Sequence, residues 1–239
     1  MTIPLKIFCL NIWHGGKLRE PLIEFIKAQE ADVLMLQEVY EAVDLGLGYP
    51  YTHFAPELLH LIDGDRKVMG NAVFSKYPIV ASDVTFYNEP FGEAEEGKRE
   101  MYPFFPRNLQ HVEIDANGTN LHVFNTHGVW GEDGNDNERR LAMGEMIIKA
   151  ILGKEHVILG GDFNTDEKSQ TIANIEQHLP NIFKGERTTS FNMRRKNPAL
   201  NYSTGIVDFI FVSSDFKVIS HASPDTDISD HLPLLATLV

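Results

Sequence analysis

The apolar runs of this chain end in, or contain, polar side chains that an ordinary buried strand would not carry. These residues are Asn11, Glu38, Asp162, Asn164, Asp208 and, just before the last apolar run, Ser229, Asp230 and His231. A strand that is buried on both faces reads as a nearly continuous apolar run. Burying an uncompensated carboxylate in such a place costs several kcal/mol or more. The carboxylates are therefore expected to converge on water, a metal ion or a histidine that shares their charge.

The donors in this set are mainly carboxylate and amide oxygens. Hard oxygen donors without a cysteine cluster favour Mg²⁺ or Mn²⁺ over zinc. The chain has one cysteine, Cys9, which rules out an intramolecular disulfide. Because Cys9 lies in the first apolar run, it is expected to be a small buried hydrophobic residue and not a nucleophile.

The composition predicts one packed domain spanning residues 1–239, with 43% hydrophobic and 10% aromatic residues. The net charge of −13 argues against a broad phosphate-binding surface for nucleic acid, although it does not exclude a nuclease. The first residues lack the basic region of a secretory signal, and no apolar run approaches the ~18 residues that span a bilayer. The expectation is a monomeric cytoplasmic enzyme.

Hydrophobic periodicity predicts strands alternating with a few helices. The expected strands are 5–12, 32–37, 70–75, 80–87, 108–114, 121–125, 157–159, 207–212 and 232–239, and the expected helices are 17–29, 138–152 and 169–179. Asn117-Gly118 is a strong hairpin signal. The core candidates of the second helix are Leu141, Ile148, Ile151 and Leu152, with Arg139-Arg140 on a helix face. Residues 88–100, 131–137 and 192–203 are predicted to be surface loops. This pattern fits an α/β (α+β) fold of two packed mixed sheets flanked by helices better than a single parallel sheet.

Six short motifs occur along the chain. Each is weak evidence alone, but their order makes them informative together. They are Leu10-Asn11, Leu36-Gln37-Glu38, Asn125-Thr126-His127, Gly161-Asp162-Phe163-Asn164, Val207-Asp208-Phe209-Ile210 and Ser229-Asp230-His231. In this order, and over nearly the whole chain, they resemble the endonuclease/exonuclease/phosphatase superfamily. The resemblance implies a four-layer αββα sandwich with the site at one end of its two sheets. It further implies a hydrolase that cleaves a phosphodiester or phosphomonoester bond with Mg²⁺ or Mn²⁺.

The resemblance also implies a role for each residue of the motifs. Glu38 is the main metal ligand, with Asn11 and Asp230 nearby. Asp208 orients His231. The residues that face the attacking water and the phosphate are Asp162, Asn164 and, as a second donor to the phosphate, His127.

These roles also make chemical sense from the residues themselves. A divalent ion on Glu38 supplies Lewis acidity, and a carboxylate such as Asp162 can hold or deprotonate water. An aspartate paired with a histidine raises the proton affinity of the ring and fixes its tautomer. Arg107, Arg194 and Arg195 are candidates for binding the substrate, and the histidines outside the motifs are taken as structural.

Several alternatives stay open at this point. In isolation, Asn11 fits an ordinary turn former, and Asp162 with Asn164 fits a helix cap. The chain has Ile12-Trp13 where abasic-site endonucleases and tyrosyl-DNA phosphodiesterases place an acidic residue, and it lacks the inositol-phosphatase signature. A nuclease acting on DNA or RNA and a non-catalytic binding module remain possible. A serine hydrolase is disfavoured, because no Gly-x-Ser-x-Gly elbow exists and neighbours in a strand point to opposite faces.

Overall fold

The computed structural model of the protein describes residues 4–41, 45–62, 64–196 and 204–239. The strands are β1 (Leu5–Asn11), β2 (Val33–Tyr40), β3 (Tyr51–Ile62), β4 (Asp65–Ser75), β5 (Ile79–Phe86), β6 (Gly92–Glu95), β7 (Asn108–Ala116), β8 (Thr119–His127), β9 (Val157–Asp162), β10 (Asp208–Val212), β11 (Val218–Ala222) and β12 (Leu234–Leu238). The helices are α1 (Arg19–Gln29), α2 (Glu138–Ile151), α3 (Gln170–Glu176) and the 3₁₀ helix η1 (Arg99–Phe104). The predicted elements are present, although their lengths differ from the prediction. Strands β2, β4, β7, β8 and β9 are longer than expected, whereas β1, β10 and β12 are shorter.

The strands form two mixed sheets. One sheet has seven strands in the order β11-β12-β1-β2-β4-β3-β6, and the other has five in the order β10-β9-β8-β7-β5. The pairs β1–β2, β3–β6 and β8–β9 are parallel, and the remaining neighbours are antiparallel. The predicted hairpin at Asn117-Gly118 joins β7 to β8, and both residues have positive φ.

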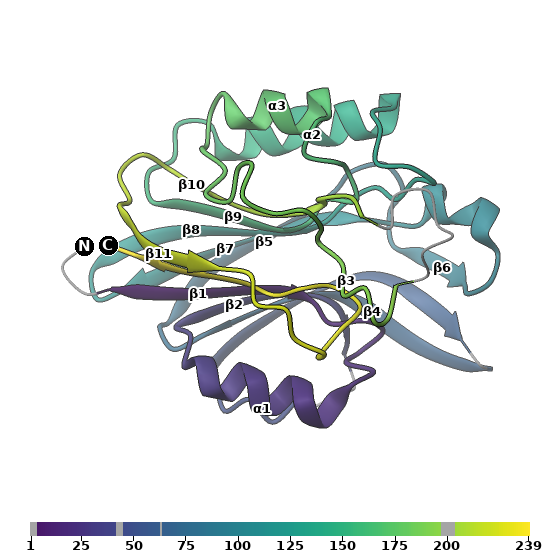
Figure 1. Ribbon diagram of the computed structural model, residues 1–239, viewed down its shortest axis with the longest axis horizontal. Helices are drawn as coiled ribbons and strands as arrows, with labels where there is room; N and C mark the ends of the chain where they lie inside the picture. The colour runs from purple at the N-terminus through teal and green to yellow at the C-terminus, as the bar shows by residue number, and fades with distance from the viewer. Residues whose placement is uncertain (1–3, 42–44, 63, 197–203) are drawn as a thin grey trace.

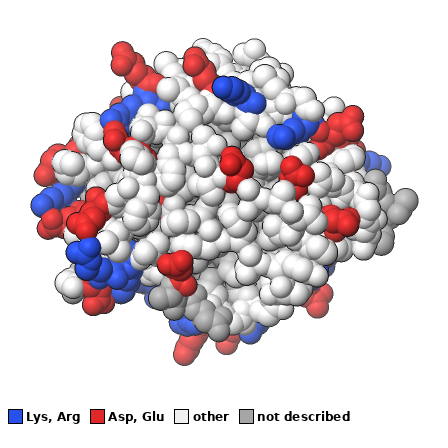
Figure 2. All heavy atoms as spheres, turned by 180° about the vertical axis from the view of Figure 1, so that it is seen from behind, with Lys and Arg blue, Asp and Glu red and all other residues white. Residues whose placement is uncertain are grey.

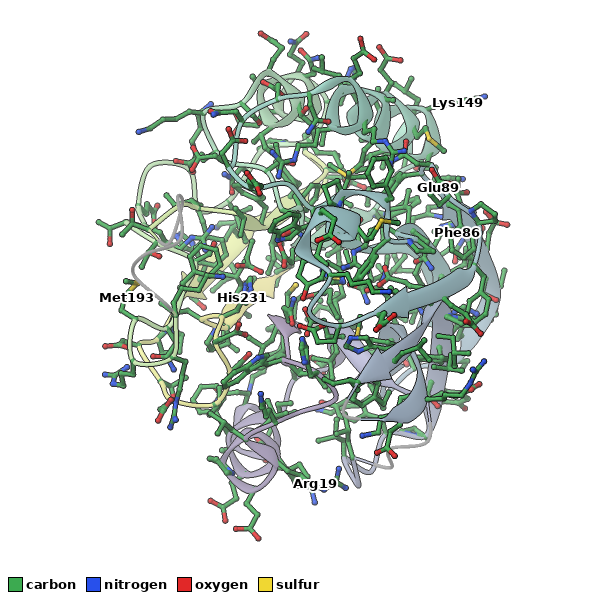
Figure 3. The ribbon with its side chains drawn as sticks, turned by 90° about the vertical axis from the view of Figure 1, so that its right-hand side faces the viewer. Arg19, Phe86, Glu89, Lys149, Met193 and His231 are labelled. Carbon is green, nitrogen blue, oxygen red and sulfur yellow. The ribbon has the colours of Figure 1, made fainter. Side chains whose placement is uncertain are left out.

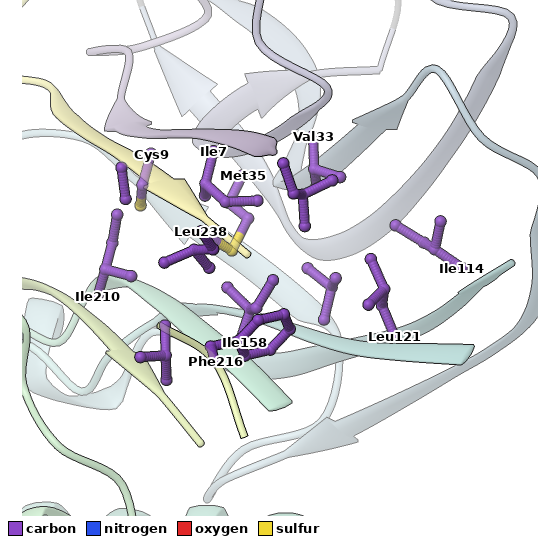
Figure 4. Packing of buried hydrophobic residues seen from close by; sticks show 14 of the residues in the cluster. Ile7, Cys9, Val33, Met35, Ile114, Leu121, Ile158, Ile210, Phe216 and Leu238 are labelled. Carbon is purple, nitrogen blue, oxygen red and sulfur yellow. The ribbon is translucent and has the colours of Figure 1, made fainter. Parts of the chain in front are cut away.

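The two sheets pack face to face, with helix α1 outside the seven-stranded sheet and helices α2 and α3 outside the five-stranded one (Figure 1). The central core is made of small and branched side chains from both inner faces, among them Ile7, Met35, Ile158 and Ile210 (Figure 4). Separate apolar clusters lie under α1 and under α2 with α3. These are the four layers that the sequence predicts.

The face that helix α2 buries matches the predicted one only in part. Its buried residues are Arg140, Met143, Gly144, Ile147 and Ile151, whereas Leu141 and Ile148 are half-buried and Leu152 is 58% exposed. The prediction holds for Ile151 and is wrong for the rest of the buried face, for two physical reasons. The Arg140 side chain points inward to backbone carbonyls, and Gly144 has no Cβ, which at that position would lie 3.0 Å from the Thr171 side chain. The small residue lets α3 pack closely against α2.

Two other predictions need correction. The segment 88–100 was expected to be a loop, but it contains β6 and the start of η1. Strand β3 was not predicted, because its polar and aromatic residues and Pro56 hide the alternation. The predicted loop 131–137 has no regular structure, whereas residues 197–203 of the predicted loop 192–203 lie outside the described residues. Within the described residues, no helix combines the length and the apolar character needed to cross a membrane.

Candidate active site

Strand register brings the sequence motifs to one end of the sandwich. In the five-stranded sheet, Asp162 pairs with His127 on one side and with Asp208 on the other. In the seven-stranded sheet, Asn11 pairs with Gln37, one residue before Glu38. Seen from that end, His231 lies between the layer with α1 and the layer with α2 and α3 (Figure 3). Residues far apart in the sequence therefore meet where the ends of the two sheets face each other.

Asp208 and His231 form a buried pair. His231 Nδ1 lies 2.8 Å from Asp208 Oδ2, and His231 Nε2 lies 3.7 Å from Asp162 Oδ2. Burial opposes the charge of His231, but Asp208 and Asp162 raise the pKa of its imidazole to about 10. The ring is therefore a cation at neutral pH, which suits it to contact a phosphate or to donate a proton.

A second histidine–carboxylate pair involves Glu57, which sequence reasoning missed. Glu57 is fully buried on β3, and its Oε2 lies 3.3 Å from His127 Nδ1. Asn71 Nδ2 donates to Glu57 Oε1 at 3.0 Å. The far nitrogen of the ring, His127 Nε2, lies 4.0 Å from Glu38 Oε1 and 3.9 Å from Asp162 Oδ2. Two imidazoles, each backed by a carboxylate, thus flank Asp162.

A β-bulge aims the Glu38 side chain into the site. The pairing of β2 with β4 shifts register between Leu36 and Val39, and Glu38 has a φ of 58°. The backbone N–H of His14 donates to Glu38 Oε2 at 2.7 Å. Burial opposes the charge on Glu38, but His14 and His127, with the hydrogen bonds from His14 and Asn11, hold the pKa of its carboxyl well below the usual range. The Glu38 carboxyl is therefore ionised at any physiological pH.

Asn11 links the two sheets. Its Nδ2 donates to Glu38 Oε1 and to Asp162 Oδ2, both at 3.1 Å. Its Oδ1 accepts from the backbone N–H of Trp13 at 3.0 Å. In this arrangement the side chain spaces the two carboxylates and neutralises part of their repulsion without adding charge.

A left-handed turn carries Asn164. This residue has a φ of 52°, its backbone N–H donates to Asp162 Oδ1 at 2.8 Å, and its Nδ2 donates to Gly128 O at 3.1 Å. Gly161, just before Asp162, has a φ of 145°, and a Cβ there would lie 2.0 Å from the carbonyl oxygen of Thr126. Only glycine allows β8 and β9 to approach so closely before the turn.

Arg140 holds this turn from behind, although the sequence placed it on a helix face. The side chain is fully buried on α2. The carbonyl oxygens that accept from its guanidinium are those of Val129, Asp133, Asn135 and Asn164. Arg140 therefore joins the segment after β8 to the turn after β9. In the sequence, Arg140 follows the helix cap Asn137 by three residues, and this position does not indicate such a role.

Asp230 lies close enough to Glu38 for the charges of the two carboxylates to interact. Burial raises the pKa of the Asp230 carboxyl, and the charge of Glu38 adds to that effect while His231 opposes it. Two carboxylates that repel each other, with an amide beside them, form a typical ligand set for a divalent cation, because the cation offsets the repulsion. The donor set of Glu38 and Asp230, with Asn11 nearby, therefore fits such an ion.

Another group of possible ligands, Asp162, Asp208 and His231, has donor atoms that all lie within 4.8 Å of one another. His231 Nδ1 is already bonded to Asp208 in this group, and the imidazole holds a proton. A metal there would have to displace that proton. Proton and phosphate chemistry suits this group better than metal binding.

The three arginines predicted to bind substrate lie in different settings. Arg107 is buried, and its Nη1 is 3.5 Å from Glu57 Oε2. Arg194 and Arg195 are exposed, and aspartates engage both of them. Arg194 Nη2 donates to Asp225 at 2.9 Å, and Arg195 Nε donates to Asp227 at 2.7 Å. Arg107 thus adjoins the His127 pair, whereas the charges of the other two are offset locally.

Sequence comparison finds a match between residues 9–231 and the profile described as the Endonuclease/Exonuclease/phosphatase family. This range contains all the residues that the register brings together. A comparison with curated protein sequences finds no match.

Solved structures share the fold. An endonuclease/exonuclease/phosphatase from Bacteroides vulgatus has a TM-score of 0.73 at 22% identity, covering 100% of this chain and 99% of its own. The mannosyl-6-phosphatase Bt3783 of Bacteroides thetaiotaomicron has a TM-score of 0.71 at 18% identity, covering 98% and 99%. The human Nocturnin catalytic domain with bound sulfate has a TM-score of 0.73 at 20% identity, covering 99% and 93%. At these identities the likeness shows the fold alone.

Proposed function

The chain belongs to the Endonuclease/Exonuclease/phosphatase family, and on that premise we propose that it is a divalent-metal-dependent hydrolase of phosphate esters. The observation that carries the proposal is the pair of buried histidine–carboxylate couples, His127 with Glu57 and His231 with Asp208, on either side of Asp162. Phosphoryl transfer needs positioning and charge stabilisation more than covalent chemistry. Two oriented imidazoles facing a carboxylate supply both.

In the proposed reaction, the role of each residue follows from whether its side chain donates or accepts a proton. His231, as a cation, donates to a phosphoryl oxygen or to the leaving oxygen. His127, backed by Glu57, contacts the phosphate from the other side. Asp162 accepts a proton from the attacking water, and Asn164, in the turn that Asp162 caps, orients that water and the phosphate. The attack is in line with the bond that breaks.

Glu38 and Asp230, with Asn11 beside them, are the residues that would hold a divalent ion. When bound, the ion supplies Lewis acidity and neutralises charge on the phosphoryl oxygens. Oxygen donors at this position favour Mg²⁺ or Mn²⁺. Glu38 is ready for this role, because its carboxyl stays ionised.

The proposal is tested with a generic aryl phosphodiester and an aryl phosphomonoester, each with Mg²⁺, with Mn²⁺ and with excess EDTA. We expect turnover of at least one ester with metal and its loss in EDTA. Hydrolysis that EDTA leaves unchanged would contradict the metal assignment. No turnover of any ester in a panel of nucleic acids, phospholipids and sugar phosphates would instead favour a non-catalytic binding module.

A nuclease acting on DNA or RNA is the second candidate. A buried Arg107 next to the Glu57–His127 pair is placed to support a phosphate contact, which favours a substrate with a flanking phosphate. The net charge of −13 weighs against binding of long duplexes. We therefore favour a small or locally recognised phosphate ester, cleaved by a monomeric cytoplasmic enzyme.

A further inference from the structure

Three metal-ligating side chains lie together on the outer face of the β7–β8 hairpin. His111 and Glu113 are on β7 and His122 is on β8, directly opposite Glu113 in the register. One ligand atom from each residue lies within 4.8 Å of the other two. Because His127 follows five residues later on the same strand, the cluster is about 17 Å from the candidate active site. It therefore belongs to a different part of the molecule.

The distances are close to those that one ion imposes on its ligands. His111 Nε2 lies 3.1 Å from His122 Nδ1, and His122 Nδ1 lies 3.8 Å from Glu113 Oε1. Two donors at zinc–ligand distances and a tetrahedral angle lie about 3.4 Å apart. The Glu113 side chain is 30% exposed, so a rotation about its own bonds can bring its oxygen to the ion.

Burial favours the uncharged form of both imidazoles. Burial, then the neighbouring His122 and Lys154, lower the pKa of His111 to about 4. Burial and Lys154 also lower the pKa of His122. A metal would therefore displace no acidic proton from either ring, and each ring has a lone pair to offer.

The surroundings fix the ligands in the way that metal sites require. The His111 ring stacks on Phe124, with centroids 4.2 Å apart and an angle of 8° between the planes. Asn120 Nδ2 donates to Glu113 Oε2 at 3.0 Å, which leaves the other carboxylate oxygen for an ion. A cavity of about 400 Å³ lined by His111, Phe124 and Lys154 lies alongside and has room for a water ligand.

We propose that His111, Glu113 and His122 bind a Zn²⁺ ion that cross-links β7 and β8, with a water molecule in the fourth position. Two imidazoles and a carboxylate are a donor set that suits zinc, in contrast to the oxygen-rich group around Glu38. The proposal does not depend on the phosphate-ester activity. The competing account is a metal-free imidazole–imidazole hydrogen bond beside the Lys154 ammonium, which repels cations.

Titration of metal-stripped protein with ZnCl₂, followed by calorimetry, separates the two accounts. We compare wild type with Glu38→Gln, His122→Gln and His178→Gln, where His178 is an exposed histidine just after α3 and is the matched control. We expect one Zn²⁺ equivalent with a Kd below about 10 µM. Glu38→Gln and His178→Gln should keep it, and His122→Gln should lose it or weaken it at least tenfold.

Two further readouts identify the ligands. Co²⁺ at the site should give visible ligand-field absorption that disappears in His122→Gln, and Zn²⁺ at about 100 times Kd should raise the Tm by about 5 °C or more. Lys154→Gln should tighten binding, because it removes a like charge. The same zinc stoichiometry and affinity in wild type and His122→Gln, or no equivalent tighter than about 100 µM, would overturn the proposal.

Discussion

Asp208 and His231 are the two site residues whose roles depend most on each other. The aspartate is buried and has the ring of His231 within 2.8 Å, and the ring owes its charge largely to that aspartate. Removing Asp208 takes away the carboxylate nearest to His231, and removing His231 leaves Asp208 buried without the imidazole beside it. The pair should therefore behave as one unit.

We expect Asp208→Asn and His231→Ala to lower kcat by similar factors, with the double variant little worse than either. Groups that act as one unit are strongly non-additive in their kinetic effects. The measurement is kcat and KM for an aryl phosphate ester in all three variants, with circular dichroism to confirm folding. Losses that multiply would show that the residues act independently.

Glu38→Gln keeps the shape of the side chain and removes the charge that would hold the divalent ion. Turnover should fall by at least about a hundredfold, and Mn²⁺ affinity measured by electron paramagnetic resonance should fall with it. Glu41→Gln, an exposed change three residues along, is the control. Unaltered Mn²⁺ affinity in Glu38→Gln would place the ion elsewhere.

The sequence predicted the residues that interrupt apolar strands, and the register brings Asn11, Asp162, Asp208 and His231 together. It missed Glu57, because the strand that carries it does not read as a strand. It also gave no sign that the backbone N–H of His14, a residue predicted to be structural, donates to Glu38. Partners that come from a neighbouring strand leave no local signal in the sequence.

At the scale of elements, α2 shows where periodicity fails. An arginine and a glycine share its buried face with Met143, Ile147 and Ile151, so the apolar pattern alone does not identify that face. The reason is the set of carbonyl groups that Arg140 satisfies between the segment after β8 and the turn after β9. The helix thereby supports the turn that carries Asn164.

Arg140→Lys should lower kcat about tenfold to a hundredfold and change KM little, because a small displacement of a reacting group is costly. Arg140→Met should also lose about 3–5 kcal/mol of stability, since buried carbonyls lose their donor. Arg139→Met is the matched control, because Arg139 is 31% exposed and pairs with Glu89. Stability comes from urea unfolding. A kcat in Arg140→Lys equal to that of wild type would limit Arg140 to a role in stability.

The β7–β8 hairpin should make the metal-free protein sensitive to acid. The pKa of His111 falls from 6.5 to about 4 on folding, so the unfolded chain binds more protons between these values. This contribution to stability is complete above pH 6.5 and is lost as the pH falls through about 4. Urea unfolding in EDTA should show a decline over this window that His111→Phe reduces and His178→Gln does not. Equal pH dependence in wild type and His111→Phe would refute this.

The whole molecule is strongly acidic, with a net charge of −13. On the face shown in Figure 2, acidic and basic side chains are scattered among a larger uncharged area, and the described residues form no extended basic patch there. Arg194 pairs with Asp225 and Arg195 pairs with Asp227, so the positive charge that the sequence suggested for binding a polymer is offset by neighbouring aspartates. The described residues of this face therefore lack the basic patch that is typical of proteins that bind long duplexes.

Duplex DNA should bind weakly at physiological salt, with a shallow dependence of log Kd on log salt concentration, because few counterions would be released. Fluorescence anisotropy from 50 to about 300 mM NaCl measures both quantities. A short single-stranded oligonucleotide of the same sequence is the comparison. Tight binding with a steep salt slope would move the nuclease to first place among the candidate functions.

Asn11 bridges Glu38 of one sheet and Asp162 of the other, so both sheets contribute to the candidate active site. Beneath it, Gln37 donates to Asn125 at 2.6 Å across the same seam. The chain crosses between the sheets several times before the last motif arrives. Turnover should therefore depend on how the seven-stranded and the five-stranded sheet pack against each other. During refolding, turnover should return only when the two sheets pack together, after each sheet has formed its own hydrogen bonds.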